Sequence, residues 1–272
     1  MDEQWRGTLY PTRLPAFHRL LPTPELADRI RWVWIPEWNL APGRVSRQEL
    51  LPFPALNLVV QPEGVTLSGP ATRRSHRDLR GSGWAVGVLL RPAAVPVFTD
   101  NPGALRDAEI PFQAPELHAA VLEAMSANEG NDDGGLRRTR AVATVVRWFQ
   151  EHVPAPTPEA ELGNRLEELI QTDAALTRVD LAADKLGVSV RTLQRLARRQ
   201  VGLPPGAMIR RYRLQEAAER LRTEPGLGIA DIAAEVGYAD HAHLAAAFRE
   251  VLGFTPSDYR RSAAPSSAPK PG

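Results

Sequence analysis

The sequence of 272 residues contains no cysteine and no long hydrophobic run. The missing thiols exclude disulfide scaffolds, cysteine-ligated zinc and catalytic cysteine, and they fit a reducing compartment. The longest apolar run, residues 84–90, is too short to cross a bilayer. The start of the chain lacks the basic and then apolar pattern of a signal peptide. We therefore expect a soluble, cytoplasmic protein with no membrane partner.

Residues suited to metal binding or catalysis are also scarce. His76 stands outside any His-x-His motif, and His241 and His243 have no third ligand nearby and, two residues apart, do not share a helix face. Ser75, His76 and Asp78 supply the letters of a hydrolase triad, but neighbours on a polar loop do not have triad geometry. We expect no metal, no cofactor and no enzyme activity.

Positive charge is concentrated in the C-terminal third. The chain has a net charge of +1, yet residues 177–261 contain 14 basic and 10 acidic residues. Within residues 191–222, nine basic residues stand against two acidic ones. Such an excess is expected where phosphates are neutralised, although a solvated arginine-rich surface has the same composition.

The first 114 residues are rich in proline and tryptophan, and their short apolar runs predict a β-rich domain. Residues 55–61 and 65–68 predict a hairpin that turns at residues 62–64, and residues 84–90 predict a buried strand that ends before Pro92. Trp32, Trp34 and Trp38 are candidate ligand-binding residues, with core packing as the alternative.

After residue 114 the composition becomes helical. We predict helices at residues 115–127 and 136–152, separated by a Gly- and Asp-rich break, as an extension of the first domain that could support dimerisation. Three prolines in residues 153–158 predict a linker. A second, all-α domain follows at residues 159–261, and residues 262–272 are predicted to be a disordered tail. The predicted fold class is therefore α+β.

Two segments of the second domain repeat each other at a spacing of 50–51 residues. Ala183, Leu186, Gly187, Leu193 and Gly202 of the first segment match Ala233, Val236, Gly237, Leu244 and Gly253 of the second. Each segment predicts a helix, a glycine turn and a second helix, with Ser189 or Asp240 as the N-cap. The sequence therefore predicts two helix-turn-helix units, at residues 179–202 and 229–253.

The second helix of the first unit has two distinct faces. Leu193 and Leu196 lie on the apolar face, while Arg191, Gln194, Arg195 and Arg198 lie on the opposite one. Arginine and glutamine are suited to bidentate contacts with base edges in the major groove. We therefore predict that this face reads double-stranded DNA.

The second unit presents mainly alanine, which cannot make bidentate contacts. We expect it to contribute affinity and register, with His241 and His243 near phosphate. Between the units, residues 205–222 predict an amphipathic helix of about 27 Å, which suits recognition helices about one DNA turn apart. Arg210, Arg211 and Arg213 on this helix are candidate phosphate contacts, with solvated arginines as the alternative.

Over about 85 residues, these motifs and the closing GFTPSDYRR resemble the DNA-binding domain of AraC-type (AraC/XylS) transcriptional regulators. The resemblance implies base contacts at Arg191, Gln194, Arg195, Ala242 and Ala246. Backbone contacts are then expected from Ser189, Thr192, Arg198, Arg210, Arg211, His241, His243 and Arg249. Many relatives have polar or basic residues where this sequence has Ala242 and Ala246, so base readout by the second unit should be weak.

The first domain resembles the companion domain of a bacterial subset of this family, through Trp32–x–Trp34 and the VTLSGP motif at residues 65–70. The resemblance implies a divergent cupin-like domain that senses a small molecule or mediates dimerisation. Our main hypothesis is a transcription regulator that responds to a small-molecule effector. An alternative limits the first domain to homodimer formation or contact with RNA polymerase. A DNA-repair enzyme of the alkyl-transfer type is excluded by the missing cysteine.

Overall fold

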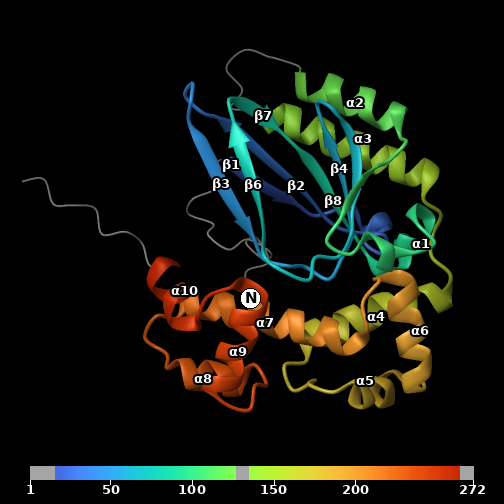
Figure 1. The fold of residues 1–272 in the computed structure, drawn as a ribbon. Coiled ribbons are helices and arrows are strands. Elements are labelled where there is room, and N and C mark those ends of the chain that lie inside the picture. The colour runs from blue at the N-terminus through green and yellow to red at the C-terminus, as the bar shows by residue number, and fades with distance from the viewer. Residues whose placement is uncertain (1–15, 127–134, 264–272) are drawn as a thin grey trace, which may run out of the picture.

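The computed structural model describes residues 16–126 and 135–263. Its first part is β-rich and its second part is entirely helical (Figure 1). The predicted break at residues 128–135 and the predicted tail lie almost wholly outside the described residues. Ser262 and Ala263, which we placed in the tail, instead form the end of the last helix.

The first part contains nine strands and two long helices among the described residues. The strands are β1 (Ala16–Leu20), β2 (Ile30–Asn39), β3 (Val45–Leu50), β4 (Asn57–Gln61), β5 (Gly64–Ser68), β6 (Ser75–Arg80), β7 (Ser82–Trp84), β8 (Val86–Leu90) and β9 (Glu109–Pro111). The short helix α1 (Val95–Phe98) follows β8, and the long helices are α2 (Pro115–Ser126) and α3 (Gly135–His152). The helices predicted on either side of the break are thus confirmed.

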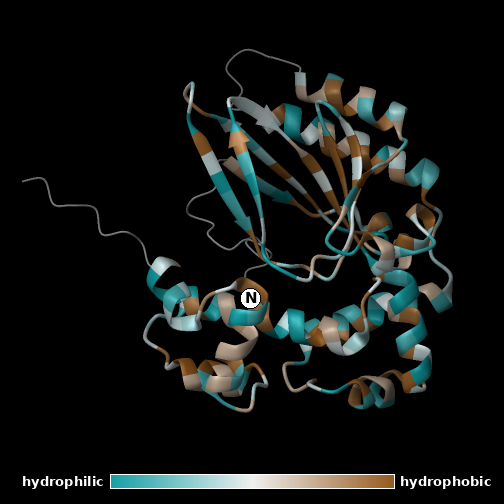
Figure 2. Cartoon of the chain, in the orientation of Figure 1, coloured by the Kyte–Doolittle hydropathy of each residue, from teal (hydrophilic) through white to brown (hydrophobic). Residues whose placement is uncertain are grey.

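The main sheet is antiparallel and runs in the order β1-β2-β8-β4-β5-β9, with β7 paired to β2. The predicted hairpin is confirmed: β4 pairs with β5 and Gln61 lies opposite Gly64. All five residues of β8 are buried, as expected for a central strand. Figure 2 shows hydrophobic residues along β8 and mostly hydrophilic ones along β6.

Helices α2 and α3 cover one face of this sheet (Figure 1). Ala141, Val145 and Phe149 recur every four residues along α3, so they form one stripe on its surface. This stripe is fully buried and packs against sheet residues such as Val33 and Ile35. The predicted helical extension is therefore built into the core of the β-rich part.

The strand β6 corrects one expectation. We placed residues 75–78 on a polar loop, but they form part of an exposed strand that pairs with β3. Alternation along this strand places Ser75 on one side and His76 and Asp78 on the other. Asp78 pairs with Arg47 of β3 at 2.7 Å. This arrangement brings no hydrolase triad together.

The second part contains seven helices among the described residues: α4 (Pro158–Thr172), α5 (Val179–Leu186), α6 (Val190–Gln200), α7 (Pro205–Thr223), α8 (Ile229–Glu235), α9 (His241–Leu252) and α10 (Pro256–Ala263). Two hydrophobic clusters hold them together, one around α4 to α6 and one around α8 to α10. The helix α7 contributes to both clusters, with Met208 and Tyr212 in the first and Leu214 and Leu221 in the second.

The helix α7 is not two-faced, contrary to our expectation. Ten of its residues are buried, and they include Arg213 and Gln215 on sides that the pattern left to solvent. The amide of Gln215 donates to the backbone oxygen of Pro52 in the β-rich part at 2.8 Å. The helix is covered from several sides because it lies between the two hydrophobic clusters and the loop before β4.

The β-rich part packs directly on the helical part (Figure 1). The ring of Phe53 lies edge-on to Trp32 at 5.7 Å and to Tyr212 at 5.6 Å, so apolar packing continues from β2 into α7. On α4, Asn164 accepts from the backbone nitrogen of Ala93 at 2.9 Å and donates to the oxygen of Asp28 at 2.7 Å. Among the described residues, no helix has both the length and the apolar character needed to cross a membrane.

Candidate nucleic-acid interface

The first helix-turn-helix unit consists of α5, a turn at Gly187, and α6. Gly187 has the left-handed backbone angle φ of 67°, which glycine adopts at little cost, and it caps α5. Ala182 and Ala183 are buried at the base of α5, where small side chains let α6 approach. Ser189 accepts a hydrogen bond from the backbone nitrogen of Thr192 at 3.1 Å and so caps α6. The predicted turn and cap are confirmed.

The predicted reading face of α6 is open to solvent. Arg191, Gln194, Arg195 and Arg198 are exposed, whereas Leu193 and Leu196 on the other face are buried. Within the described residues, none of these four polar side chains forms a hydrogen bond or an ion pair. Their donors are therefore available to a partner from outside the chain, and the β-rich part does not cover them.

The second unit repeats this geometry in α8 and α9. Gly237 takes the left-handed φ of 82°, and Asp240 accepts from the backbone nitrogen of His243 at 2.7 Å. The exposed side of α9 contains Ala242, Ala246, Arg249 and Glu250, together with His241 and His243 at its start. A face of methyl groups offers far fewer hydrogen bonds to base edges than the face of α6.

The two histidines lie at the N-terminal end of α9. The ring of His243 packs edge-on against Tyr238 at 5.1 Å, and its Nδ1 lies 3.4 Å from the backbone nitrogen of Ala239. His243 thus has a local structural role in the turn between α8 and α9. Over residues 16–126 and 135–263, no group of three or more potential ligands could hold a metal ion.

The three arginines near the start of α7 lie in different environments. Arg210 is exposed, Arg211 is half-buried and Arg213 is buried. Burial lowers the pKa of Arg211 below its ordinary value, while nearby Glu250 opposes that shift. Arg213 donates to the backbone oxygen of Ile170 at 2.7 Å and pairs with Glu216. Our inclusion of Arg213 among the phosphate contacts is therefore wrong, because its guanidinium holds α7 to α4.

The candidate tryptophans all point to the same side of β2. Trp32 is buried against Phe53. Trp34 and Trp38 are partly exposed, and their ring nitrogens donate to Asn57 Oδ1 at 3.0 Å and to the backbone oxygen of Arg80 at 3.1 Å. Trp32 therefore contributes to the core between the two parts of the chain.

The sequence pattern did not identify α4 or its buried carboxylate. Glu167 is 1% exposed. It accepts a hydrogen bond from Tyr212 of α7 and pairs with Arg31 and Arg91 of the β-rich part. The signal for the helix itself was present, since Thr157 followed by Pro158 is a typical helix start. Thr157 indeed accepts from the backbone nitrogen of Ala160.

Two family models match the chain. Residues 182–262 match a family described as a helix-turn-helix domain, and residues 18–111 match a domain of unknown function. The HTH-type transcriptional activator RhaS of Escherichia coli is 35% identical over 82 residues, which are 30% of this chain and 29% of that protein. The chain thus aligns with less than a third of the length of this relative, which is named as a transcriptional activator and not as an enzyme.

Solved structures show limited likeness. The C-terminal domain of AraT from Geobacillus stearothermophilus is 28% identical, with a TM-score of 0.37 over 43% of this chain and 94% of that chain. ToxT from Vibrio cholerae is 13% identical, with a TM-score of 0.43 over 90% of this chain and 97% of that chain. The family model, the matched relative and the two capped units agree with one another. Residues 182–262 of this chain are a helix-turn-helix domain of the AraC type.

Proposed function

We propose that the chain is a sequence-specific DNA-binding transcription regulator that responds to a small-molecule effector. The observation that carries the proposal is the free, exposed polar face of α6, which consists of Arg191, Gln194, Arg195 and Arg198. Unpaired arginine and glutamine at the exposed side of a helix-turn-helix are suited to contacts with guanine and adenine in the major groove.

The second unit would hold the protein in register. The helix α7 has 19 residues and is therefore about 28 Å long, which is of the same order as the separation of about 34 Å between successive major grooves on one side of B-DNA. Ala242 and Ala246 would touch thymine methyl groups or let the backbone approach phosphate. Backbone contacts are proposed for Ser189, Thr192, Arg198, Arg210, Arg211, His241, His243 and Arg249.

The β-rich part would provide the regulation. Its contacts with α4 and α7 join it to the DNA-binding domain through Glu167, Asn164 and Tyr212. Because α6 packs with α4 and α7 in one hydrophobic cluster, a change in the β-rich part would alter the packing that supports α6. Trp34 and Trp38 would line an effector site within that part. A homodimer, contact with RNA polymerase and a place in the cytoplasm belong to the same proposal.

Selection of binding sites from a random duplex library tests the DNA-binding proposal. The full chain should enrich one motif whose strongly specified bases fall within one major groove. Enrichment of no motif at low and physiological salt would contradict it. A thermal-shift survey of the full chain against a broad metabolite panel tests the response to an effector, and the absence of any shift would favour the alternative without an effector.

A further inference from the structure

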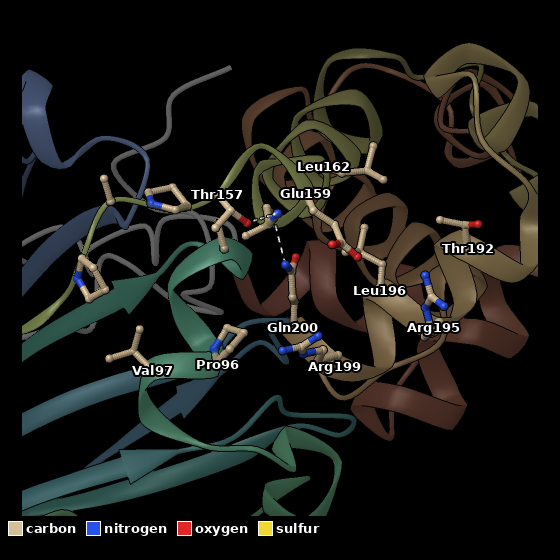
Figure 3. Close-up of a pocket in the computed structure, with 15 residues that line it drawn as sticks. Pro96, Val97, Thr157, Glu159, Leu162, Thr192, Arg195, Leu196, Arg199 and Gln200 are labelled. Atoms are coloured by element: carbon tan, nitrogen blue, oxygen red, sulfur yellow. Dashed lines mark hydrogen bonds between the residues drawn. The ribbon is translucent and has the colours of Figure 1, made fainter.

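A cleft of about 530 Å³ lies between the β-rich part, the linker before α4, and α6 (Figure 3). This volume is in the range of pockets that bind small molecules. The cleft touches Val97 of the β-rich part, Pro154 and Pro156 of the linker, and Thr192, Arg195 and Arg199 of α6. All three elements that a regulator must connect therefore meet at one site.

The cleft combines an apolar wall with a cationic one. Pro154 and Pro156 line the apolar side together with Val97, which is 46% exposed. On α6, the guanidinium groups of Arg195 and Arg199 have no ion-pair partner anywhere in the described parts of the chain. Glu159 supplies a single carboxylate, so the lining has a net positive charge.

A hydrogen bond from Gln200 joins two of the helices that line the cleft. Gln200 is 3% exposed, and its amide donates to the backbone oxygen of Ala160 at 3.1 Å, which ties the end of α6 to the first turn of α4. Leu196 and Leu162 pack beside it and also line the cleft. A bound molecule would therefore find its walls already in place.

The helix geometry makes Arg195 common to two surfaces. Thr192, Arg195 and Arg199 are spaced by three and four residues and share the edge of α6 that faces the linker. Arg191, Gln194 and Arg198 share the neighbouring edge, and Arg195 stands between the two. One guanidinium cannot hold a base edge and a ligand anion in bidentate fashion at the same time.

We propose that this cleft binds an amphipathic organic anion, with an apolar body against Val97 and the prolines and an acidic group on Arg199 and Arg195. The inference rests on the proposed function, since occupancy of the cleft would withdraw Arg195 from DNA. The anion and DNA then weaken each other's binding to the protein. Linkage requires that each lowers the affinity for the other by the same factor.

The test uses the full chain and the fluorescent anion anilinonaphthalene sulfonate. Phenylnaphthylamine, which has the same rings without the sulfonate, is the neutral comparison. Arg199→Ala should raise the Kd of the anionic dye about tenfold, because a charge-assisted contact is lost. Arg198→Ala is the matched control, since Arg198 is exposed on the same helix outside the cleft, and it should change this Kd less than about twofold. The neutral dye should not distinguish the variants.

The second arm adds a duplex selected by the protein itself. Saturating duplex should raise the Kd of the dye and release it. Saturating dye should raise the Kd of the duplex by the same factor as the duplex raises that of the dye. Equal dye binding by Arg199→Ala and the unmodified chain would overturn the site, as would simultaneous binding of dye and duplex without mutual effect. If no duplex is selected, the proposed function fails while the dye arm still decides whether the cleft binds anions.

Discussion

The hydroxyl group of Tyr212 on α7 donates a hydrogen bond of 2.8 Å to Oε1 of Glu167 on α4. The other oxygen of Glu167 receives Arg91 from the β-rich part at 3.0 Å, and Arg31 lies 3.2 Å from Oε1. One buried carboxylate therefore connects the helix between the two helix-turn-helix units to the β-rich part. This contact links the β-rich part of the chain directly to α7.

Removal of this carboxylate should be costly. Glu167→Ala leaves Arg31 and Arg91 without their shared anion, and we expect a loss of about 3–5 kcal/mol in the free energy of unfolding. Tyr212→Phe leaves both arginine pairs in place and removes a hydroxyl that donates to Glu167 and accepts from Gln171 at 3.0 Å, so it should cost about 1–2 kcal/mol. Urea denaturation of both variants measures the difference. Equal stabilities for the two would contradict the assigned role of Glu167.

The turn glycines should differ in their tolerance of alanine. In Gly187→Ala the added Cβ would contact no neighbouring atom within 4 Å, but the residue must keep a left-handed backbone, which costs about 1–2 kcal/mol. Gly237→Ala adds a clash, because its Cβ would lie 2.5 Å from Cγ2 of Thr177, so we expect it to be the more destabilising. Gly226→Ala, with free space and no left-handed angle, is the control and should change little. Thermal melts would rank the three, and a reversed order would refute the account of the turns.

The cap of α6 separates stability from DNA affinity. Ser189→Ala removes the acceptor for the backbone nitrogen of Thr192 and should cost about 1 kcal/mol of stability. Ser189→Asp keeps a capping oxygen, so stability should be retained, but its charge should weaken binding to DNA. Melting temperatures and DNA titrations on the same samples test this. DNA affinity unchanged in Ser189→Asp would place the start of α6 away from phosphate.

The extent to which this structure follows from local sequence differs between its parts. The two units were predictable because caps, glycine turns and apolar stripes act over a few residues. The role of Glu167 was not, since Arg91 and Arg31 lie 76 and 136 positions away in the sequence. Arg213 was misassigned for the same reason: its basic character suggested phosphate, while its burial against α4 is a tertiary effect. The strand β6 was missed because it is polar and exposed, without the apolar alternation that marks a half-buried strand.

Exposure on α7 predicts which arginine contributes electrostatically to DNA binding. Arg210→Ala should weaken binding to all duplexes alike. It should also make the negative slope of log affinity against log salt shallower by about one. We expect a smaller change in slope for Arg211→Ala, because Arg211 is half-buried. Titrations at several salt concentrations with a selected and an unrelated duplex measure both effects. A loss confined to the selected duplex would mean that Arg210 reads bases.

Base selection by the full chain and by Arg195→Ala, carried out in parallel from one random duplex library, decides whether α6 reads the bases. We predict that Arg195→Ala loses preference at one base position and binds the original motif about 1–3 kcal/mol more weakly. Arg199→Ala, on the same helix but off the reading face, should retain the full motif. An unchanged motif and unchanged affinity for Arg195→Ala would contradict the assignment of α6 as the reading helix.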